Sequence, residues 1–310
     1  RSEVMSKIAF LFPGQGAQKI GMGQDFYENF ACAKEIFDQA SQWLSLDMKA
    51  LCFEKNDRLD LTEYTQAALV TTCLAMEKVV EEHGIYPDVA AGLSLGEYCA
   101  ISVAGGMSVQ AAITTVRKRG ILMEQAVPAG KGAMAAVLGM SAAVIEDIIS
   151  GTEAEIANYN CPGQIVITGP KNAVEEAAAK LKEAGARRII PLAVSGPFHS
   201  SMLKNAGKEL EKELEKVTFS ALKIPYVTNV TAQYVTDIST TKELLAKQIS
   251  SSVRWQQSVE KMLENEVDTF IEIGPGKTLS GFLRKIAPDT RVYNIQNISD
   301  LENMAFSIAN

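Results

Sequence analysis

The chain has 310 residues, of which 47% are hydrophobic, and carries a formal net charge of -7. This length and composition support a sizeable hydrophobic core, in one large domain or in two unequal ones. Nucleic-acid binding and adsorption to acidic membranes both depend on positive charge, so the net negative charge argues against either partner. The longest apolar stretch, around residues 133–145, is interrupted by Gly139 and Ser141 and is too short to cross a bilayer.

The cysteine pattern predicts a reducing compartment. Five cysteines are scattered along the chain without a C-x-x-C pair. The odd number and the scattered spacing fit neither a disulfide framework nor a structural zinc site. We therefore predict a cytoplasmic protein that binds no metal. The residues ahead of Met5 are interpreted as a cloning remnant rather than a signal peptide, and they are left out of the fold prediction.

Strands and helices alternate through the first part of the chain. Residues 7–12 (KIAFLF) have the pattern of a buried strand that ends in a glycine-rich turn, and amphipathic helices are expected near 22–43 and 64–83. A short strand at 88–91 precedes a helix over 95–103. Such alternation predicts a mostly parallel sheet covered by helices.

A second glycine-rich turn follows a strand near the C-terminus. The strand is expected at 270–273 and the turn, GPGKT, at 274–278. The turn is similar to the end of a nucleotide-binding P-loop, but the first glycine of that motif would have to stand at Ile271. A nucleotide site is therefore not expected there.

From residue 132 onward the order of elements changes. The apolar and turn patterns predict strand, helix, strand, strand, helix and strand, over 133–138, 142–150, 155–159, 164–169, 172–185 and 188–194. The order βαββαβ is that of a ferredoxin-like unit. We therefore predict an α/β fold in which a ferredoxin-like small subdomain, residues 131–196, is inserted into a large subdomain formed by residues 5–130 and 197–310.

Ser94 has the surroundings of a nucleophile. It lies in the segment AGLSLGEY, residues 91–98, where a predicted strand turns directly into a predicted helix. Gly92 and Gly96 would relieve crowding in so tight a turn, which lifts the serine hydroxyl into an open crevice. The same residues also fit a capping box, in which Ser94 and Glu97 satisfy amide groups at the start of a helix. The spacing alone does not decide between these two interpretations.

A serine nucleophile needs a base, and the chain has only two histidines. His83 falls in the last turn of a predicted helix, where an imidazole can complement the helix dipole. His199 follows the strand expected at 188–194 and precedes a helix expected near Ser201, so it lies at the same sort of sheet edge as Ser94. The amino end of that helix would also disfavour the charged imidazole. We therefore predict that His199 is the general base, the alternative being a structural loop histidine.

An arginine falls on the inner face of a helix predicted over residues 108–127. Arg119 lies among the apolar residues of that face, which recur at helical spacing, whereas Arg117 points elsewhere. These apolar residues are Ala112, Val116, Met123 and Ala126. A buried guanidinium requires an anionic partner. A carboxylate of the protein and a carboxylate of a ligand are both compatible with this placement.

Five short motifs occur in a fixed order along the chain. They are FPGQGAQ at 12–18, GLSLGEY at 92–98, Arg119-Gly120, GPFH at 196–199 and IGPG at 273–276. With these five motifs in this order, the chain resembles the malonyl-CoA:acyl carrier protein transacylases of bacterial fatty acid synthesis, and the resemblance covers essentially all of residues 5–310. The resemblance implies a hydrolase-like large subdomain. It also implies transfer of a malonyl group from malonyl-CoA to the phosphopantetheine thiol of acyl carrier protein, through a malonyl-serine ester and without a cofactor or metal.

The resemblance implies roles for individual residues at the reacting centre. Ser94 would be the acylated nucleophile and His199 its base. Arg119 would bind the free carboxylate of the malonyl group. Gln15 and the main-chain amide of Leu95 would form the oxyanion hole.

Two further residues receive supporting roles by the same resemblance. Gln248 would orient His199 through its main-chain carbonyl, and Asn160 matches a family loop beside the cleft. Many members of the family have histidine immediately before the nucleophile, where this chain has Leu93. One polar contact near the serine is therefore lost, but the pairing of serine and base does not depend on it.

The expected protein partner is acidic, as acyl carrier proteins are, so docking to a negatively charged chain requires a local positive patch. Arg187 and Arg188 are the candidates, because they lead the strand that delivers His199. The alternative for either arginine is a solvated charge at a turn. A monomer is expected, since no long apolar surface helix is left without a partner.

Other functions compete with this interpretation. A serine hydrolase or thioesterase of the α/β-hydrolase type shares the elbow, but that family follows its serine with an acid and then a histidine. A non-catalytic carrier-protein or coenzyme A-binding module would lack Ser94 or His199, and both are present. Within the transferase interpretation, polyketide synthesis is the alternative to fatty acid synthesis.

Overall fold

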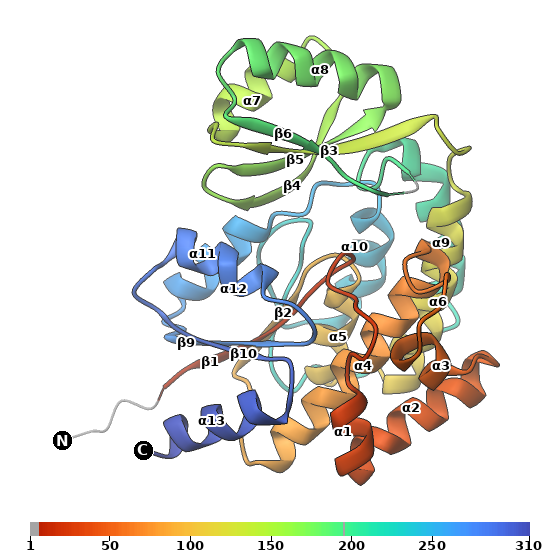
Figure 1. The fold of residues 1–310 in the computed structure, drawn as a ribbon, viewed down its shortest axis with the longest axis vertical. Helices are drawn as coiled ribbons and strands as arrows, with labels where there is room; N and C mark the ends of the chain where they lie inside the picture. The colour runs from red at the N-terminus through yellow and green to blue at the C-terminus, as the bar shows by residue number, and fades with distance from the viewer. Residues whose placement is uncertain (1–5, 195) are drawn as a thin grey trace.

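The computed structural model describes residues 6–194 and 196–310. Figure 1 shows two subdomains, a large one built on a six-stranded sheet and a small one, drawn in yellow and green, built on a four-stranded sheet. The predicted fold class, α/β with a mostly parallel sheet and a ferredoxin-like unit, is confirmed. The residues interpreted as a cloning remnant, together with Met5, lie outside the described part of the chain.

Parallel pairing dominates the large sheet, whose strand order is β10-β9-β1-β2-β7-β8. Its strands are β1 (Ile8–Phe12), β2 (Val89–Gly92), β7 (Tyr226–Val227), β8 (Tyr234–Val235), β9 (Thr269–Ile273) and β10 (Arg291–Ile295). The β7–β8 hairpin is antiparallel and the other pairs are parallel. Strand β1 is buried on both faces, with Phe10 and Phe12 in one hydrophobic cluster and Ala9 and Leu11 in another, as expected for a central parallel strand.

The first part of the chain supplies helices to the large subdomain. They are α1 (Gln24–Asn29), α2 (Ala31–Leu44), α3 (Met48–Phe53), α4 (Thr62–Glu82), α5 (Gly96–Val103) and α6 (Val109–Gln125). The single helix expected near 22–43 is wrong, because α1 and α2 are separated at Phe30, whose backbone is extended (φ −131°, ψ 121°). Its N–H still donates to Phe26 and its carbonyl accepts from Lys34. The apolar periodicity runs through this break, so a pattern argument does not detect it.

The small subdomain has the βαββαβ order of a ferredoxin-like unit. Its elements are β3 (Gly132–Leu138), α7 (Ala142–Ile149), β4 (Glu155–Cys161), β5 (Gln164–Pro170), α8 (Lys171–Glu183) and β6 (Arg188–Pro191). The antiparallel sheet has the order β4-β5-β3-β6, and its helices lie on the side away from the large subdomain (Figure 1). The strand expected over 188–194 is shorter. Regular pairing ends at Pro191, which has no N–H for the ladder, and one bond from Leu192 to Met134 precedes the departure of the chain.

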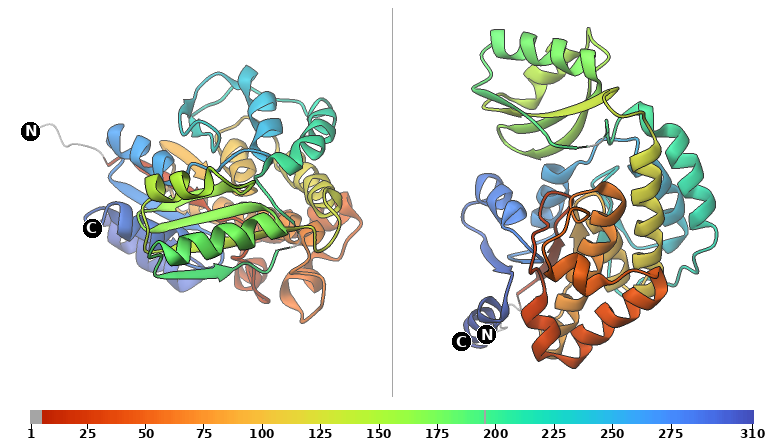
Figure 2. Two further views of the ribbon diagram at one scale, coloured as in Figure 1. Left: turned by 90° about the horizontal axis from the view of Figure 1, so that it is seen from above. Right: turned by 45° about the vertical axis from the view of Figure 1, so that its right-hand side comes forward.

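The last part of the chain returns to the large subdomain. It forms short 3-10 helices at Ser201–Leu203 and Ile238–Thr240, then α9 (Lys204–Leu214), α10 (Thr241–Gln248), α11 (Trp255–Glu264), α12 (Thr278–Ile286) and α13 (Ile298–Ala309). Figure 2 shows the small subdomain stacked on one end of the large one. Main-chain hydrogen bonds join the two, from Val253 to the Ala157 carbonyl at 2.7 Å and from Tyr159 to the Val253 carbonyl at 2.9 Å. These bonds fix β4 above the large sheet.

All five cysteines are free thiols, and four of them are buried. Within residues 6–194 and 196–310, no helix is both long and apolar enough to cross a membrane.

Candidate active site

Ser94 lies in the tight turn between β2 and α5, at the carboxyl end of a central parallel strand. Its backbone is left-handed, with a φ of 56°. A Cβ atom at Gly92 would lie 1.9 Å from the main-chain oxygen of Gly96, and one at Gly96 would lie 2.4 Å from that of Phe12. Both glycines are required by close main-chain approach, as in a nucleophile elbow.

The capping-box interpretation of Ser94 is wrong. Leu95 is the residue that caps α5, and no side chain makes a capping hydrogen bond there. The Ser94 hydroxyl instead lies 2.8 Å from Nε2 of His199, a residue 105 positions further along the chain. The carboxylate of Glu97 accepts from Asn229 rather than from Ser94.

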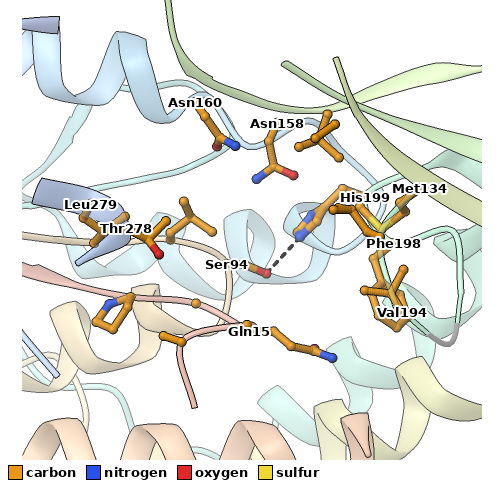
Figure 3. Close-up of a pocket in the computed structure, with 18 of the residues that line it drawn as sticks. Gln15, Ser94, Met134, Asn158, Asn160, Val194, Phe198, His199, Thr278 and Leu279 are labelled. Atoms are coloured by element: carbon orange, nitrogen blue, oxygen red, sulfur yellow. Dashed lines mark hydrogen bonds between the residues drawn. The ribbon is translucent and has the colours of Figure 1, made fainter. Parts of the chain in front are cut away.

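His199 is held with its second nitrogen against main-chain carbonyls. Nδ1 lies 2.9 Å from the oxygen of Gln248 and 3.2 Å from that of Ser251. Two acceptors at Nδ1 require the hydrogen on that nitrogen, so Nε2 is the free acceptor that faces Ser94. Figure 3 shows this contact at the centre of the cavity.

Burial is the main cause that lowers the pKa of His199 from 6.5 to about 4, and the charge of Arg119 acts in the same direction. The imidazole is therefore neutral at pH 7 and able to accept the serine proton. From the sequence, the preference of His199 for the neutral form is expected to come from the amino end of the helix that follows. In the structure the element that follows His199 is a single 3-10 turn, Ser201–Leu203, and burial has the leading role.

Arg119 is fully buried on the inner stripe of α6, together with Ala112, Val116 and Met123. Its Nη1 donates to Oε1 of Gln66 at 2.7 Å. Its Nη2 donates to Oε1 of Gln248 at 2.8 Å and to the Ser94 hydroxyl at 3.1 Å. These three acceptors are neutral, and Nε has no hydrogen-bond partner among the described residues. The guanidinium thus makes no ion pair with a carboxylate in the described chain, which favours a ligand as its anionic partner.

Arg117, two positions earlier on α6, points elsewhere, as the helical spacing predicts. It donates to the main-chain oxygen of Glu63, and its guanidinium lies 4.7 Å from the ring centre of Tyr64. The two arginines of α6 therefore have separate surroundings.

The expected oxyanion-hole residues lie on either side of the serine turn. Gln15, in the turn after β1, lines the cavity, and its side-chain amide donates to the hydroxyl of Thr62 at 2.9 Å. Leu95 follows the nucleophile at the start of α5, and its own amide donates to no atom of the described residues. Because the side chain of Gln15 is bound to Thr62, the main-chain amide of Gln15 is the better candidate for a donor to the oxyanion.

Gln248, at the end of α10, contributes more than the carbonyl that the resemblance implies. Its side chain is buried, accepts from Arg119 and donates from Nε2 to the main-chain oxygen of Ser94 at 2.9 Å. One residue therefore orients the imidazole, the guanidinium and the nucleophile. No local sequence pattern marks this side-chain role.

Two buried residues behind the elbow were not assigned a catalytic or positioning role from the sequence. Oε1 of Glu97 accepts from the main-chain amide of Asn229 at 2.7 Å and from Nε2 of Gln248 at 3.3 Å. Burial raises the pKa of Glu97 to about 7. Asn229 accepts from the amide of Ser94 at 2.8 Å. The motif that contains Ser94 pointed at least to Glu97, whereas Asn229 follows a two-residue strand and carries no sequence signal.

A cavity of about 300 Å³ opens between the two subdomains around Ser94 and His199. Figure 3 shows Asn158 and Asn160 of the small subdomain facing the serine across it. Asn160 lies on strand β4 rather than on a loop, which corrects the sequence interpretation. It is 6% exposed, and its Oδ1 has no hydrogen-bond partner among the described residues. The apolar part of the lining includes Leu93, the residue that replaces the histidine of many relatives.

Of the arginines expected at a docking patch, Arg188 begins β6 and Arg187 immediately precedes it, and both are exposed. Successive strand residues point to opposite faces of a sheet. Ile190 packs against the large core cluster and Ile189 against the core under the small subdomain's helices. Arg188 therefore shares its face with Ile190 and with Leu192, which lines the cavity, and Arg187 points to the other face.

Comparison with known proteins gives the class of this arrangement. Residues 9–296 match the family of the acyl transferase domain, so the chain is an acyltransferase. It is 46% identical to the malonyl CoA-acyl carrier protein transacylase of Bacillus subtilis (strain 168), over 98% of this chain and 97% of that protein. The chain belongs to the malonyl CoA-acyl carrier protein transacylase family.

Solved structures of the family have the same fold. The crystal structure of malonyl CoA-acyl carrier protein transacylase from Clostridium perfringens Atcc 13124 has a TM-score of 0.94 and 42% identity, covering 98% of both chains. A type II PKS acyl-carrier protein in complex with its malonyl-transacylase gives a TM-score of 0.94 at 36% identity, covering 97% of this chain and 100% of that one.

Proposed function

We propose that this acyltransferase moves the malonyl group of malonyl-CoA onto the phosphopantetheine thiol of acyl carrier protein, for fatty acid synthesis. The names of its relatives support this substrate pair. The observation that carries the mechanism is that the imidazole of His199 and the guanidinium of Arg119 both lie within hydrogen-bond distance of the Ser94 hydroxyl. The Ser94 hydroxyl oxygen lies 2.8 Å from Nε2 of His199 and 3.1 Å from Nη2 of Arg119. The site therefore combines a nucleophile, a general base and a cation that can bind a carboxylate.

In the first half-reaction, His199 takes the hydroxyl proton of Ser94 as the oxygen attacks the thioester carbonyl. The tetrahedral intermediate collapses with cleavage of the carbon–sulfur bond. Coenzyme A leaves as its thiol after receiving the proton from His199. A malonyl ester remains on Ser94.

The second half-reaction reverses these steps with a new thiol. The phosphopantetheine sulfur gives its proton to His199 and attacks the ester carbonyl. Collapse of this intermediate breaks the bond to Ser94, whose oxygen recovers the proton. Because the first product leaves before the second substrate reacts, the kinetics are ping-pong. No cofactor or metal enters this scheme.

The developing oxyanion needs donors that are already in place. The main-chain amides of Leu95 and Gln15 suit this role, because the first donates to no atom of the described residues and the side chain of the second is bound to Thr62. Across the cavity, Asn160 lines the wall opposite Ser94 (Figure 3), where a side-chain amide suits the phosphopantetheine arm that coenzyme A and the carrier protein share.

Docking of the carrier protein is assigned to the cleft mouth near Arg188, with Arg187 as the second candidate. Both side chains are exposed, and their charge complements an acidic partner. The enzyme is proposed to act as a cytoplasmic monomer, without nucleic-acid or membrane partners. Size-exclusion chromatography with light scattering tests the monomer.

Two alternative activities differ in their acceptor. A carrier protein of polyketide synthesis is a second candidate partner, because one structural relative was solved with such a protein. Hydrolysis is less well supported, because main-chain carbonyls rather than a carboxylate orient His199.

Intact-mass spectrometry after mixing with malonyl-CoA tests the proposal. We expect one malonyl group on Ser94 that disappears when phosphopantetheinylated acyl carrier protein is added, with the group recovered on the carrier. Ser94→Ala should form no adduct, and His199→Ala should form it slower by roughly 10²- to 10⁴-fold. His83→Ala is the matched control, because that ring lies at a helix end, against the Val79 carbonyl and the ring of Phe30, and is not part of the cavity lining. Release of free malonate without thiol-dependent transfer would identify a hydrolase.

A further inference from the structure

Asn229 is fully buried two residues after the end of β7 and takes no part in the reaction steps above. We propose that it is a positioning residue that holds the strained main chain of Ser94, so that the hydroxyl and the Leu95 amide face the substrate carbonyl. The proposal rests on the proposed acyl transfer through Ser94.

The nucleophile needs such support because its backbone is unfavourable. Ser94 has a φ of 56°, in the left-handed region that residues with a side chain avoid. A conformation of this kind persists only where surrounding contacts hold it. Relaxation at this one residue would turn both the hydroxyl and the following amide of Leu95.

The side chain of Asn229 makes hydrogen bonds to two residues of the turn that carries the nucleophile. Its Oδ1 accepts the Ser94 amide hydrogen at 2.8 Å, and its Nδ2 donates to the Gly92 carbonyl at 2.7 Å. One planar amide thus holds the last residue of β2 and the nucleophile at once, with Leu93 between them. Only a side chain with one donor and one acceptor at this spacing satisfies both groups.

Asn229 is itself fixed on both sides. Its amide donates to Oε1 of Glu97 at 2.7 Å, and its carbonyl accepts from the Arg254 amide at 3.0 Å. Glu97 lies on the first turn of α5, so Asn229 also ties the helix that follows the nucleophile. The turn between strand and helix is therefore held at its beginning, middle and end by one residue.

The same residue is coupled to the base. Nε2 of Gln248 lies 3.3 Å from Oδ1 of Asn229 and 2.9 Å from the Ser94 carbonyl, while the Gln248 carbonyl accepts from His199. Asn229 and Gln248 thus hold the two main-chain polar groups of Ser94. Loss of Asn229 should leave the base and the substrate site in place and misalign the nucleophile.

The first experiment compares Asn229→Ala with the wild type in single-turnover formation of the malonyl adduct. We expect the rate constant for acylation at saturating malonyl-CoA to fall roughly a hundredfold, as for a misplacement of reacting groups by about 1 Å. The dissociation constant of malonyl-CoA, measured on variants that also carry Ser94→Ala, should stay within about twofold. An unchanged acylation rate, or a loss that lies wholly in malonyl-CoA binding, would overturn the proposal.

Thr228→Val is the matched control for a loss of packing. Thr228 precedes Asn229 in the same buried turn, is 1% exposed, and its hydroxyl has no hydrogen-bond partner among the described residues. The control should acylate at the wild-type rate. A control that is slowed as much as Asn229→Ala would show that any disturbance of this turn has the same effect, which contradicts a specific role. Absence of an adduct in the wild type would instead defeat the proposed function.

Asn229→Asp is a second, isosteric variant that decides the matter if Asn229→Ala does not fold. An ionised aspartate cannot donate to the Gly92 carbonyl and stands beside Glu97, whereas a protonated one donates from its hydroxyl as the amide does. The ratio of the acylation rate constants, variant to wild type, should therefore rise severalfold from about pH 8 to about pH 5.5. In the wild type His199 stays neutral over this range, because its pKa is about 4. A ratio that is flat with pH would contradict the role of the Asn229 donor.

Discussion

Arg119 meets Ser94 directly, since Nη2 of the guanidinium lies 3.1 Å from the serine hydroxyl oxygen. A carboxylate bound by Arg119 is therefore held next to the nucleophile. In a malonyl thioester a single methylene separates the carboxylate from the thioester carbonyl, which matches this short span. We propose that this arrangement selects a short dicarboxylic half-thioester and brings its reacting carbonyl to Ser94.

Arg119→Ala should depress malonyl transfer far more than acetyl transfer. Hydrogen bonds to charged groups contribute about 1.5–3 kcal/mol each, so a tenfold to hundredfold larger loss of kcat/KM is expected with malonyl-CoA than with acetyl-CoA. The control is Arg117→Ala, which removes the same charge from the same helix at a site where the guanidinium lies against Glu63 and Tyr64. Equal losses with both donors would remove the carboxylate-binding role from Arg119.

The rate of Ser94 acylation should fall only in strong acid. Burial and Arg119 lower the pKa of His199 to about 4, and only the neutral imidazole can accept the serine proton. Going down in pH, His199 becomes charged and inactive as a base near pH 4, rather than near its ordinary value of 6.5. Single-turnover acylation followed by rapid quenching gives the profile. An acid limb centred near 6.5 would mean that His199 is not buried as described.

Glu97 should make the stability of the fold depend on pH. Burial raises its pKa from 4.5 to about 7, so the folded state holds a proton that the unfolded state has released between these values. Its contribution to stability is complete below 4.5 and is lost as the pH rises through about 7. Glu97→Gln keeps the acceptor for Asn229 and carries no charge, so it should gain stability relative to the wild type at higher pH.

Urea unfolding at about pH 5 and about pH 8 measures this effect. The free energy of unfolding of Glu97→Gln minus that of the wild type should increase by on the order of 2 kcal/mol between the two conditions. Comparison with the wild type removes the contribution of His199, which both proteins share. Glu176→Gln, at an exposed ion pair of α8, is the control and should show no such change. A pH-independent difference for Glu97→Gln would show that its carboxyl titrates alike in both states.

The parts of the site that the sequence predicted have a local signal. Gly92 and Gly96 flank Ser94 because main chains approach too closely there for a Cβ atom, and that constraint is visible as a motif. The inward position of Arg119 follows from helical periodicity alone. Both signals arise from a few neighbouring residues, so they survive without knowledge of the tertiary structure.

The parts that escaped prediction depend on segments brought together by the fold. Asn229 comes from the turn after β7 and Gln248 from the end of α10, and their side chains bind main-chain atoms of Gly92 and Ser94. Every residue has the same main-chain atoms, so a main-chain partner leaves no pattern in the sequence. The break at Phe30 was missed for a related reason, since its hydrogen bonds to both neighbouring helices keep the apolar face continuous.

Gln15→Ala distinguishes a side-chain oxyanion donor from a main-chain one. Loss of an oxyanion donor typically slows turnover by about a hundredfold or more. Because the side-chain amide of Gln15 is bound to Thr62, alanine keeps the donor that we assign, and the expected loss of kcat is no more than about tenfold. Thr62→Val, which removes the anchor, should have a similarly small effect. A hundredfold loss for Gln15→Ala would assign the oxyanion contact to the side chain.

Arg188→Glu should impair use of the carrier protein more than Arg187→Glu does. Both residues are exposed, but the alternation of β6 places Arg188 on the face of Leu192, which lines the cavity. Charge reversal there should lower kcat/KM for acyl carrier protein roughly tenfold at low salt and flatten its salt dependence. Transfer to a small thiol should not change, because no docking is involved. Equal effects of the two substitutions, or a parallel loss with the small thiol, would place the docking surface elsewhere.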